Sequence, residues 1–101
     1  CLLNAIKKTT YSQNSYHNIT RVIELTRNFH YFTEKGELML YFSDLNLMAG
    51  LLACMTADVA HPGVNNPFLL AMRHTKAIRY NDRAVLEHHH CAIAFKLLLD
   101  P

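Results

Sequence analysis

The chain has 101 residues, half of them apolar, and a formal net charge of +2 from ten basic and eight acidic side chains. This length suits one domain at most, and the balanced charge argues against a nucleic-acid partner. The longest apolar stretch, residues 45–57, is shorter than the roughly 20 residues that a membrane span needs. We therefore expect a buried helix there and no membrane span.

The three cysteines, Cys1, Cys54 and Cys91, are odd in number and form no C-x-x-C pair. This pattern argues against a disulfide framework or a zinc knuckle and fits a reducing compartment. We therefore expect an intracellular protein, either cytoplasmic or within a large intracellular assembly. Because the chain begins at Cys1 rather than Met, we also expect that it was cut from a longer one.

The first predicted helix follows Asn18, which can cap it. Its apolar positions have helical spacing and are Ile19, Val22, Ile23, Leu25, Phe29 and Phe32. A break is predicted at residues 34–37. Ser43 can then cap a second helix from Asp44 to about Ala57, where Asp44 suits the positive end of the helix dipole. This helix is apolar nearly all round, which predicts burial.

The second half of the chain predicts three more helices. Asn66-Pro67 reads as a cap followed by proline at the first helical position. Thr75 is expected to cap a short helix ending near Tyr80. Asn81-Asp82 is expected to open a last helix from about Arg83 to Leu99, with one face carrying Leu86, His90, Ile93 and Leu97. We predict an all-α fold without internal repeats.

Polar side chains gather in a few short clusters. His17 and Arg21 are four residues apart on one helical face. Asp58 and His61 are three residues apart at the end of the apolar helix, and three consecutive histidines occupy 88–90. Successive helical residues point about 100° apart, so the triplet is not a ready-made metal site.

Each cluster has a structural explanation beside the chemical one. His90 on an apolar face is more often a buried core residue than a ligand, and Asn66 or Asn81 can serve simply as caps. Asp58 is harder to explain in this way, because a carboxylate at the end of an apolar helix is costly to bury without a partner.

Three motifs, taken together, identify a family resemblance. They are Tyr16-His17-Asn18, then Ala-Asp-x-x-His-Pro-Gly-x-x-Asn at 57–66, then Tyr-Asn-Asp-x-x-Val-Leu-Glu-x-His-His at 80–90. This set resembles the catalytic domain of class I 3′,5′-cyclic-nucleotide phosphodiesterases, of the HD-type metal-dependent phosphohydrolase superfamily. The likeness continues through Phe95-Lys96-Leu97-Leu98. It runs from about Tyr11 to Leu98 and covers only the front part of the family's all-helical domain. Residues 1–101 are therefore expected to form a partial phosphodiesterase-like domain.

The resemblance implies a reaction and roles. In the family, zinc and magnesium activate a bridging hydroxide that attacks the cyclic phosphate, and a histidine protonates the departing 3′ oxygen. His17 matches that proton donor, and Asp58 matches the aspartate that binds both metals. His61 and Glu87 match positions that surround the hydroxide without binding metal.

Other matching and departing positions lie around the same site. Tyr16 and Asn66 match residues of the substrate pocket. Arg21 stands where the family has a histidine ligand, Ala57 where it has the histidine of its His-Asp pair, and Ala60 where it has a second aspartate. Catalytic zinc normally has three protein ligands and a water. Only Asp58 remains, so we expect no metal cofactor.

The arginine suggests a specific replacement. Arg21 brings a positive charge to a position where the family has a residue that binds a metal cation. Arginine also pairs well with carboxylates. We therefore expect Arg21 to form an ion pair with Asp58 in place of the metal. The alternative is that Arg21 is an ordinary surface residue.

Three functions follow from these observations. The leading one is a non-catalytic homologue kept for scaffolding or assembly, with other protein chains covering its apolar faces. The second is an active phosphodiesterase for 3′,5′-cAMP or cGMP in signal transduction. The third is a sensor that binds cyclic nucleotide without hydrolysing it. The active enzyme would require Ala57 and Ala60 to be engineered replacements and Arg21 to be tolerated. The family's final metal-binding aspartate and the residues that hold the base lie beyond residue 101, and the missing base-holding residues weaken the sensor.

Overall fold

The computed structural model describes residues 2–10 and 13–99, and within them it contains helices and no strand. This confirms the predicted all-α class. The elements are α1 (Leu2–Thr9), α2 (Ile19–Lys35), the short 3₁₀ helix η1 (Leu38–Leu40), α3 (Asp44–Thr56), α4 (Asn66–Ala71), α5 (Thr75–Arg79) and α6 (Val85–Leu99). Cys1 and Tyr11 lie outside the described residues, so the expectations that concern them are not addressed by the structure.

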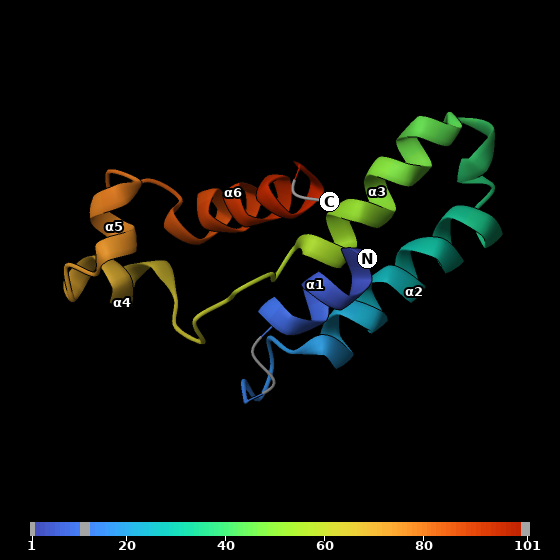
Figure 1. Cartoon of the computed structure of the whole chain (residues 1–101). Helices are drawn as coiled ribbons and strands as arrows, with labels where there is room; N and C mark the ends of the chain where they lie inside the picture. The colour runs from blue at the N-terminus through green and yellow to red at the C-terminus, as the bar shows by residue number, and fades with distance from the viewer. Residues whose placement is uncertain (1, 11–12, 100–101) are drawn as a thin grey trace.

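Helices α2 and α3 form an antiparallel hairpin that turns through η1 (Figure 1). The Asn18 side chain accepts hydrogen bonds from the backbone N–H groups of Thr20 and Arg21, and Ser43 accepts one from Asn46. Both predicted caps are confirmed. The two helices approach closely at Gly50, where an added Cβ would lie 2.3 Å from the Phe29 ring.

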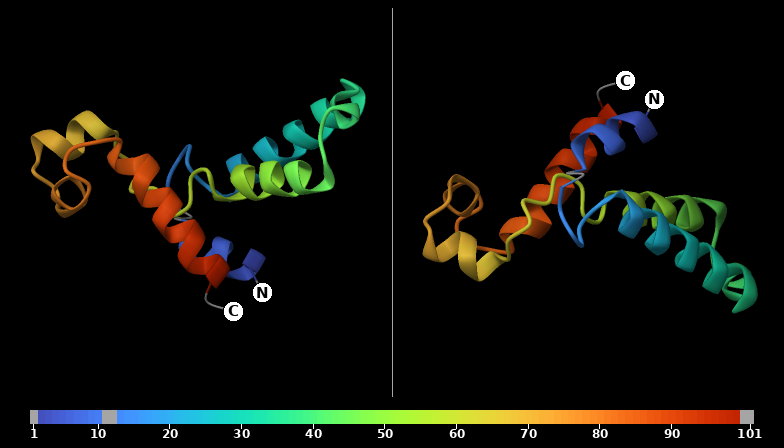
Figure 2. Two further views of the ribbon diagram at one scale, coloured as in Figure 1. Left: turned by 90° about the horizontal axis from the view of Figure 1, so that it is seen from above. Right: turned by 90° about the horizontal axis from the view of Figure 1, so that it is seen from below.

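The remaining helices form the other part of the molecule. Helix α6 packs against α1, α3, α4 and α5, and α4 and α5 gather at its N-terminal end (Figures 1 and 2). Figure 2 shows the α2–α3 hairpin projecting away from α6, while α1 lies beside the C-terminal part of α6. The molecule is accordingly elongated, measuring 45 × 28 × 25 Å.

The main hydrophobic core lies between α4, α5 and the start of α6. It consists of Leu69, Ala77, Val85 and Leu86, with Val64 and Tyr80 packed against it. The predicted inner face of the last helix is confirmed in part, because Leu86 and His90 are buried while Ile93 and Leu97 are half-buried. His90 is thus a buried residue of this face.

The predicted burial of the apolar helix is wrong. No residue of α3 is buried, and Leu45 and Met48 expose 67% and 53% of their surface. The reason is that α3 is apolar on nearly every side, whereas the helices that pack against it, chiefly α2 and α6, cover only part of it. The surplus apolar surface remains uncovered.

Several predicted helix starts differ from the structure by a few residues. Asn65 caps α4 by accepting from the Phe68 N–H, so Asn66 is already helical. His74, not Thr75, caps α5 by accepting from the Lys76 N–H. The last helix begins at Val85, since Asn81, Asp82 and Ala84 have left-handed backbones with φ of 53°, 58° and 40°. Helix α1 was not predicted.

The remaining sequence expectations concern cysteines and membrane spans. Cys54 and Cys91 are free thiols, as predicted, and burial raises the pKa of Cys54. Across residues 2–10 and 13–99, every helix is too short or too polar to cross a lipid bilayer.

Candidate functional site

The polar residues singled out from the sequence meet where α2 begins, α3 ends and α6 passes. His17 lies in the loop directly before the Asn18 cap of α2. Asp58 and His61 lie in the turn that follows α3, and His90 lies beside His61 on the buried face of α6. Residues distant in the sequence therefore form one cluster.

Backbone hydrogen bonds hold the turn after α3. The N–H of Val59 donates to the carbonyl of Thr56 at 3.1 Å, and the N–H of His61 donates to that of Asp58 at 3.2 Å. Ala60 between them has a left-handed backbone with φ of 56°, which costs a residue with a Cβ about 1–2 kcal/mol. The turn therefore stores some strain to place Asp58 and His61 on the same side.

Asn14 ties this turn to the segment before α2. Its side-chain amide donates to the carbonyl of His61 at 2.9 Å. Gly63 has a φ of 82°, and an added Cβ there would lie 2.6 Å from Oδ1 of Asn14. Glycine is required at this position for two reasons, the left-handed backbone and the close approach of Asn14. Asn14 was missed by the sequence analysis because no motif marks it.

His17 and Asp58 form the polar centre of the site. Nδ1 of His17 lies 3.1 Å from Oδ2 of Asp58, with the two side chains 31% and 18% exposed. The distance is that of an ion pair. However, Nδ1 is shielded from solvent and makes no hydrogen bond with correct alignment to any described residue. The pair is thus close but poorly aligned.

Three imidazoles form a column beside this pair. The rings of His17 and His61 stack with centroids 3.7 Å apart and planes at 11°, and those of His61 and His90 lie 5.4 Å apart at 19°. Nδ1 of His90 donates to the carbonyl of Val59 at 2.7 Å, because a carbonyl can only accept. Nδ1 of His61 accepts from the N–H of Gly63 at 3.0 Å. The backbone therefore orients His61 and His90.

The environment favours the neutral form of His61. Burial lowers its pKa, and the neighbouring imidazoles of His17 and His90 lower it further. The carboxylates of Asp58 and Glu87 act in the opposite direction without reversing the shift. A neutral imidazole has a lone pair on the nitrogen that carries no proton. In His61 that lone pair is on Nδ1, which accepts from the N–H of Gly63, so Nε2 carries the proton and can donate a hydrogen bond.

The predicted ion pair between Arg21 and Asp58 is wrong. No ion pair within 4.0 Å joins these two residues, both of which the structure describes. The guanidinium of Arg21 lies over the ring of Tyr16, 5.1 Å from its centroid, and Asp58 lies beside His17 instead. Tyr16 is near Arg21 in sequence and is itself exposed, so a cation–π contact forms without burying the charge.

Asn66 and Glu87 lie together at the start of α6. The amide of Asn66 donates to Oε2 of Glu87 at 3.0 Å, and Oδ1 of Asn66 accepts from the N–H of Leu86 at 2.9 Å. The Asn66 hydrogen bond is the main reason that the pKa of Glu87 is lowered. Both polar atoms of Asn66 are thereby engaged within the protein.

The histidine triplet diverges, as its helical geometry predicts. His90 points inward, whereas His88 stacks on Tyr80 with centroids 6.0 Å apart. His89 contacts the same Tyr80 ring edge-on at 6.2 Å. Burial, and then the charge of Lys76, lower the pKa of His89 to about 4. His90 therefore lies in the interior, whereas His88 and His89 lie beside Tyr80.

A hollow of about 410 Å³, with both polar and apolar residues in its lining, lies beside His17 and His61. Its lining residues are His17, His61, Gly63, Val64, Asn65, Phe68 and Leu86. Ligand pockets typically measure about 300–1,000 Å³. The hollow is therefore large enough for a small ligand beside the imidazole column.

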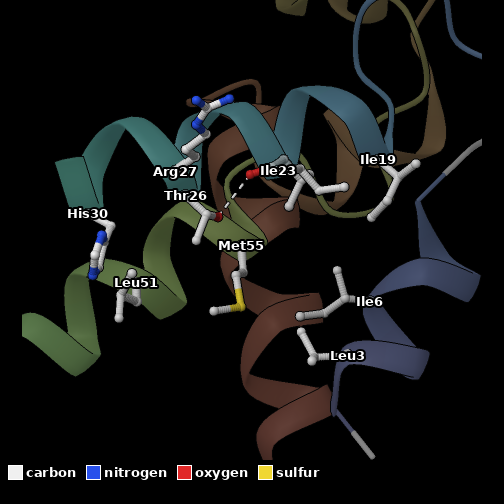
Figure 3. A pocket seen from close by; sticks show the side chains of 10 residues that line it. Leu3, Ile6, Ile19, Ile23, Thr26, Arg27, His30, Leu51 and Met55 are labelled. Carbon is white, nitrogen blue, oxygen red and sulfur yellow. Dashed lines mark hydrogen bonds between the residues drawn. The ribbon is translucent and has the colours of Figure 1, made fainter.

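A second hollow, of about 430 Å³, is almost entirely apolar (Figure 3). Leu3 and Ile6 of α1 face it from one side, and Leu51 and Met55 of α3 line it near α2. The hydroxyl of Thr26 is turned back onto α2, where it donates to the carbonyl of Val22 at 2.8 Å. The groove therefore offers carbon surface and few polar partners.

Comparison with known proteins matches the chain to one family. The family model described as 3′5′-cyclic nucleotide phosphodiesterase matches residues 16–101. The chain is 40% identical over 90 residues to the probable 3′,5′-cyclic-AMP phosphodiesterase pde-4 of Caenorhabditis elegans, covering 89% of this chain and 13% of that protein.

Two further relatives agree. The rat (Rattus norvegicus) 3′,5′-cyclic-AMP phosphodiesterase 4C is 40% identical over 88 residues, covering 87% of this chain and 16% of that protein. The probable 3′,5′-cyclic phosphodiesterase pde-6 of Caenorhabditis elegans is 34% identical over 95 residues, covering 94% of this chain and 12% of that protein. The chain thus spans less than a fifth of the length of these curated relatives.

Proposed function

Because the chain belongs to the 3′5′-cyclic nucleotide phosphodiesterase family, we propose that it is a non-catalytic homologue with a scaffolding or assembly role. The observation that carries this proposal is the set of side chains at the family's metal-ligand positions. Arg21 and Ala57 replace two ligands that the resemblance implies, and Ala60 replaces an acidic residue beside them. Asp58 alone is retained.

The family's two-metal centre does not fit these residues. Zinc there needs about three protein ligands, and the alanine side chains offer no donor atom. Arg21 keeps a permanent positive charge near the site, held over Tyr16 at 5.1 Å. Two metal ions activate a hydroxide and offset the phosphate charge in this type of reaction. A chain that cannot hold both ions at these positions is expected to lack hydrolytic activity.

The retained polar residues then have other roles. His17, the counterpart of the proton donor, lies against Asp58, and Asn66 uses both its amide atoms to hold the start of α6. Asn14 and Gly63 lock the turn after α3. In this proposal these residues preserve the shape of the module.

The uncovered apolar surface supports an assembly role. Large exposed side chains crowd the far end of the α2–α3 hairpin, and they are Tyr31, Phe32, Leu38, Met39, Leu40, Tyr41, Leu45 and Met48. Contiguous apolar surface of this kind commonly marks a protein-binding face. In this proposal another protein surface inside the cell covers these side chains. That surface belongs either to a separate chain or to further residues of the same polypeptide.

An activity assay tests the proposal. With Zn²⁺ and Mg²⁺ added, we expect the chain to hydrolyse neither 3′,5′-cAMP nor 3′,5′-cGMP above the rate without protein. The matched variant is Asp58→Ala, which removes the one retained ligand. Hydrolysis by the parent chain that disappears in Asp58→Ala would contradict the proposal and support an active phosphodiesterase.

A cyclic-nucleotide sensor is the second candidate. The hollow of about 410 Å³ beside His17 and His61 favours it. Calorimetric titration with 3′,5′-cAMP separates the candidates, since saturable binding without turnover supports the sensor. The scaffold instead predicts no such binding, together with slowed amide hydrogen exchange of α3 in the native assembly relative to the isolated chain.

A further inference from the structure

A hollow of about 560 Å³ lies where α5 ends and α6 begins (Figure 1), and the function proposed above does not use it. Its lining residues are Arg79, Tyr80, Asn81, Arg83 and His88. It shares no lining residue with the hollow beside His17 and His61. Its volume lies within the range of small-ligand pockets, about 300–1,000 Å³, and both arginines carry a permanent positive charge.

Positive charge is concentrated around this hollow. Residues 73–83 hold four of the chain's ten basic side chains, and Asp82 is the only acid among them. Four basic side chains against one acidic side chain leave the segment with a formal charge of +3, whereas the whole chain carries +2. After burial, the charges of Lys76 and Arg79 are among the causes that lower the pKa of His89. The segment therefore produces a positive potential that attracts anions.

The two arginines of the lining have no carboxylate partner among residues 2–10 and 13–99. The ion pairs in those ranges are formed by Asp58 and Glu34. The carboxylate of Glu87, at the start of α6, accepts from an asparagine amide instead. Arg79 lies over the ring of its neighbour in the lining, 5.9 Å from the centroid, and both arginines are exposed. Each guanidinium has five N–H donors, which are thus available to an anion from outside.

The backbone between α5 and α6 is fastened, so the two arginines are carried by a defined loop. The N–H of Arg83 donates to the carbonyl of Tyr80 at 3.1 Å, and the N–H of Asp82 donates to a carbonyl of α5 at 2.9 Å. Asn81 and Asp82 have left-handed backbones, and the chain folds back so that Arg83 lines the same hollow as Arg79. Tyr80 is packed against the hydrophobic core. A ligand therefore needs to order the arginine side chains but not the loop.

We propose that this hollow binds the phosphate group of a small molecule, either free phosphate or a phosphomonoester, through Arg79 and Arg83. A planar guanidinium presents paired N–H donors that match phosphate oxygens, and such charge-assisted bonds are short and strong. A phosphomonoester carries a charge of about −1.5 to −2 at pH 7, which two arginines offset. Asn81 and His88 add N–H donors to the same lining. The inference goes beyond the proposed function, because this site lies apart from the family's catalytic residues and requires no hydrolysis.

Calorimetric titration of the full chain tests the site with two ligands, inorganic phosphate and O-phosphoserine. The salt concentration is kept at about 0.15 M, where weak attraction to surface charges is screened. We expect at least one of the two ligands to saturate a single site per chain with a Kd below about 1 mM. Serine and acetate, which lack the phosphate group, should not bind. Equal affinities for the two ligands would assign the site to phosphate itself, and tighter binding of O-phosphoserine would assign it to a phosphomonoester.

Three arginine variants locate the binding. Arg79→Gln and Arg83→Gln should each weaken the affinity at least about tenfold, because each loses charge-assisted hydrogen bonds to phosphate. Arg27→Gln removes the same charge from an exposed position of α2; it is the matched control and should bind as the parent does. A further variant, Arg83→Lys, keeps the charge but not the planar pair of donors. Its affinity should lie between those of the parent and Arg83→Gln.

Several results would overturn the site. They are the absence of saturable binding by both ligands, acetate binding as tight as phosphate binding, or equal weakening in Arg27→Gln and Arg83→Gln, which would indicate a general charge effect. Circular dichroism verifies that each variant is folded. If one is not, amide NMR of the parent chain decides, because phosphate must shift the resonances of residues 79–83 and leave those of α2 in place. Failure here does not affect the hydrolysis assay of the proposed function, and hydrolysis in that assay does not affect this site.

Discussion

The side chain of Asn66 caps helix α6 from twenty residues earlier in the chain, by accepting the N–H of Leu86 at 2.9 Å. Leu86 is the second residue of α6, so its N–H has no partner within the helix. Asn66→Ala removes this acceptor and the bond to Glu87. We expect the free energy of unfolding in urea to fall by about 1–2 kcal/mol, as for other lost caps.

Asn66→Asp is the matched variant for this cap. It keeps the acceptor for the Leu86 N–H but loses the donor to Glu87 and sets two carboxylates side by side. It should therefore lose less stability at pH 4 than at pH 7, because protonation of either carboxyl relieves the repulsion between them. Equal losses at both pH values would show that the Glu87 contact adds nothing.

The left-handed backbone at position 60 predicts a stabilising substitution. Ala60 has φ of 56°, whereas Ala57 at the end of α3 has φ of −52° and ψ of −39°. Ala60→Gly should raise the free energy of unfolding by about 1 kcal/mol, since glycine adopts φ above zero without strain. Ala57→Gly should lower it by about 0.5–1 kcal/mol. The prediction fails if both substitutions change stability in the same direction.

Acid should destabilise the fold through His89. Its pKa falls from the ordinary value of 6.5 to about 4, chiefly because of burial. The unfolded chain therefore binds a proton more readily than the folded one, and stability decreases as the pH falls from 6.5 toward 4. His89→Asn should show a shallower decline in urea unfolding across this window. Asn28→Ala, at an exposed neutral position of α2, should keep the parent's decline.

The sequence predicted those parts of the fold that depend on local signals. Asn18 and Ser43 cap the helices that they were expected to cap, because a cap contacts backbone only two or three residues away. The start of α6 was wrong by about two residues, since its cap is Asn66, which only the tertiary fold brings there. Helix α1 was missed although Leu2, Leu3 and Ile6 have helical spacing, because no capping residue precedes it in the sequence.

The same difference between local signals and tertiary contacts applies to the candidate site. The family motifs singled out His17, Asp58 and His61, which the structure places side by side, but the residue types alone could not show that the two imidazoles stack. The Arg21 prediction failed because its partner was sought at Asp58, while Tyr16 offered a contact nearby. The prediction that α3 is buried failed because an apolar helix is buried only where neighbouring helices cover it.

The bond from Asn14 to the carbonyl of His61 also bears on the order in which the molecule assembles. It joins positions 47 residues apart, so a long loop must close before it can form, whereas α2 and α3 meet through one short turn. The hairpin should therefore form early in refolding and the imidazole column late. A kinetic φ-value near zero for Asn14→Ala, with higher values in the hairpin, would place the site among the last contacts to form.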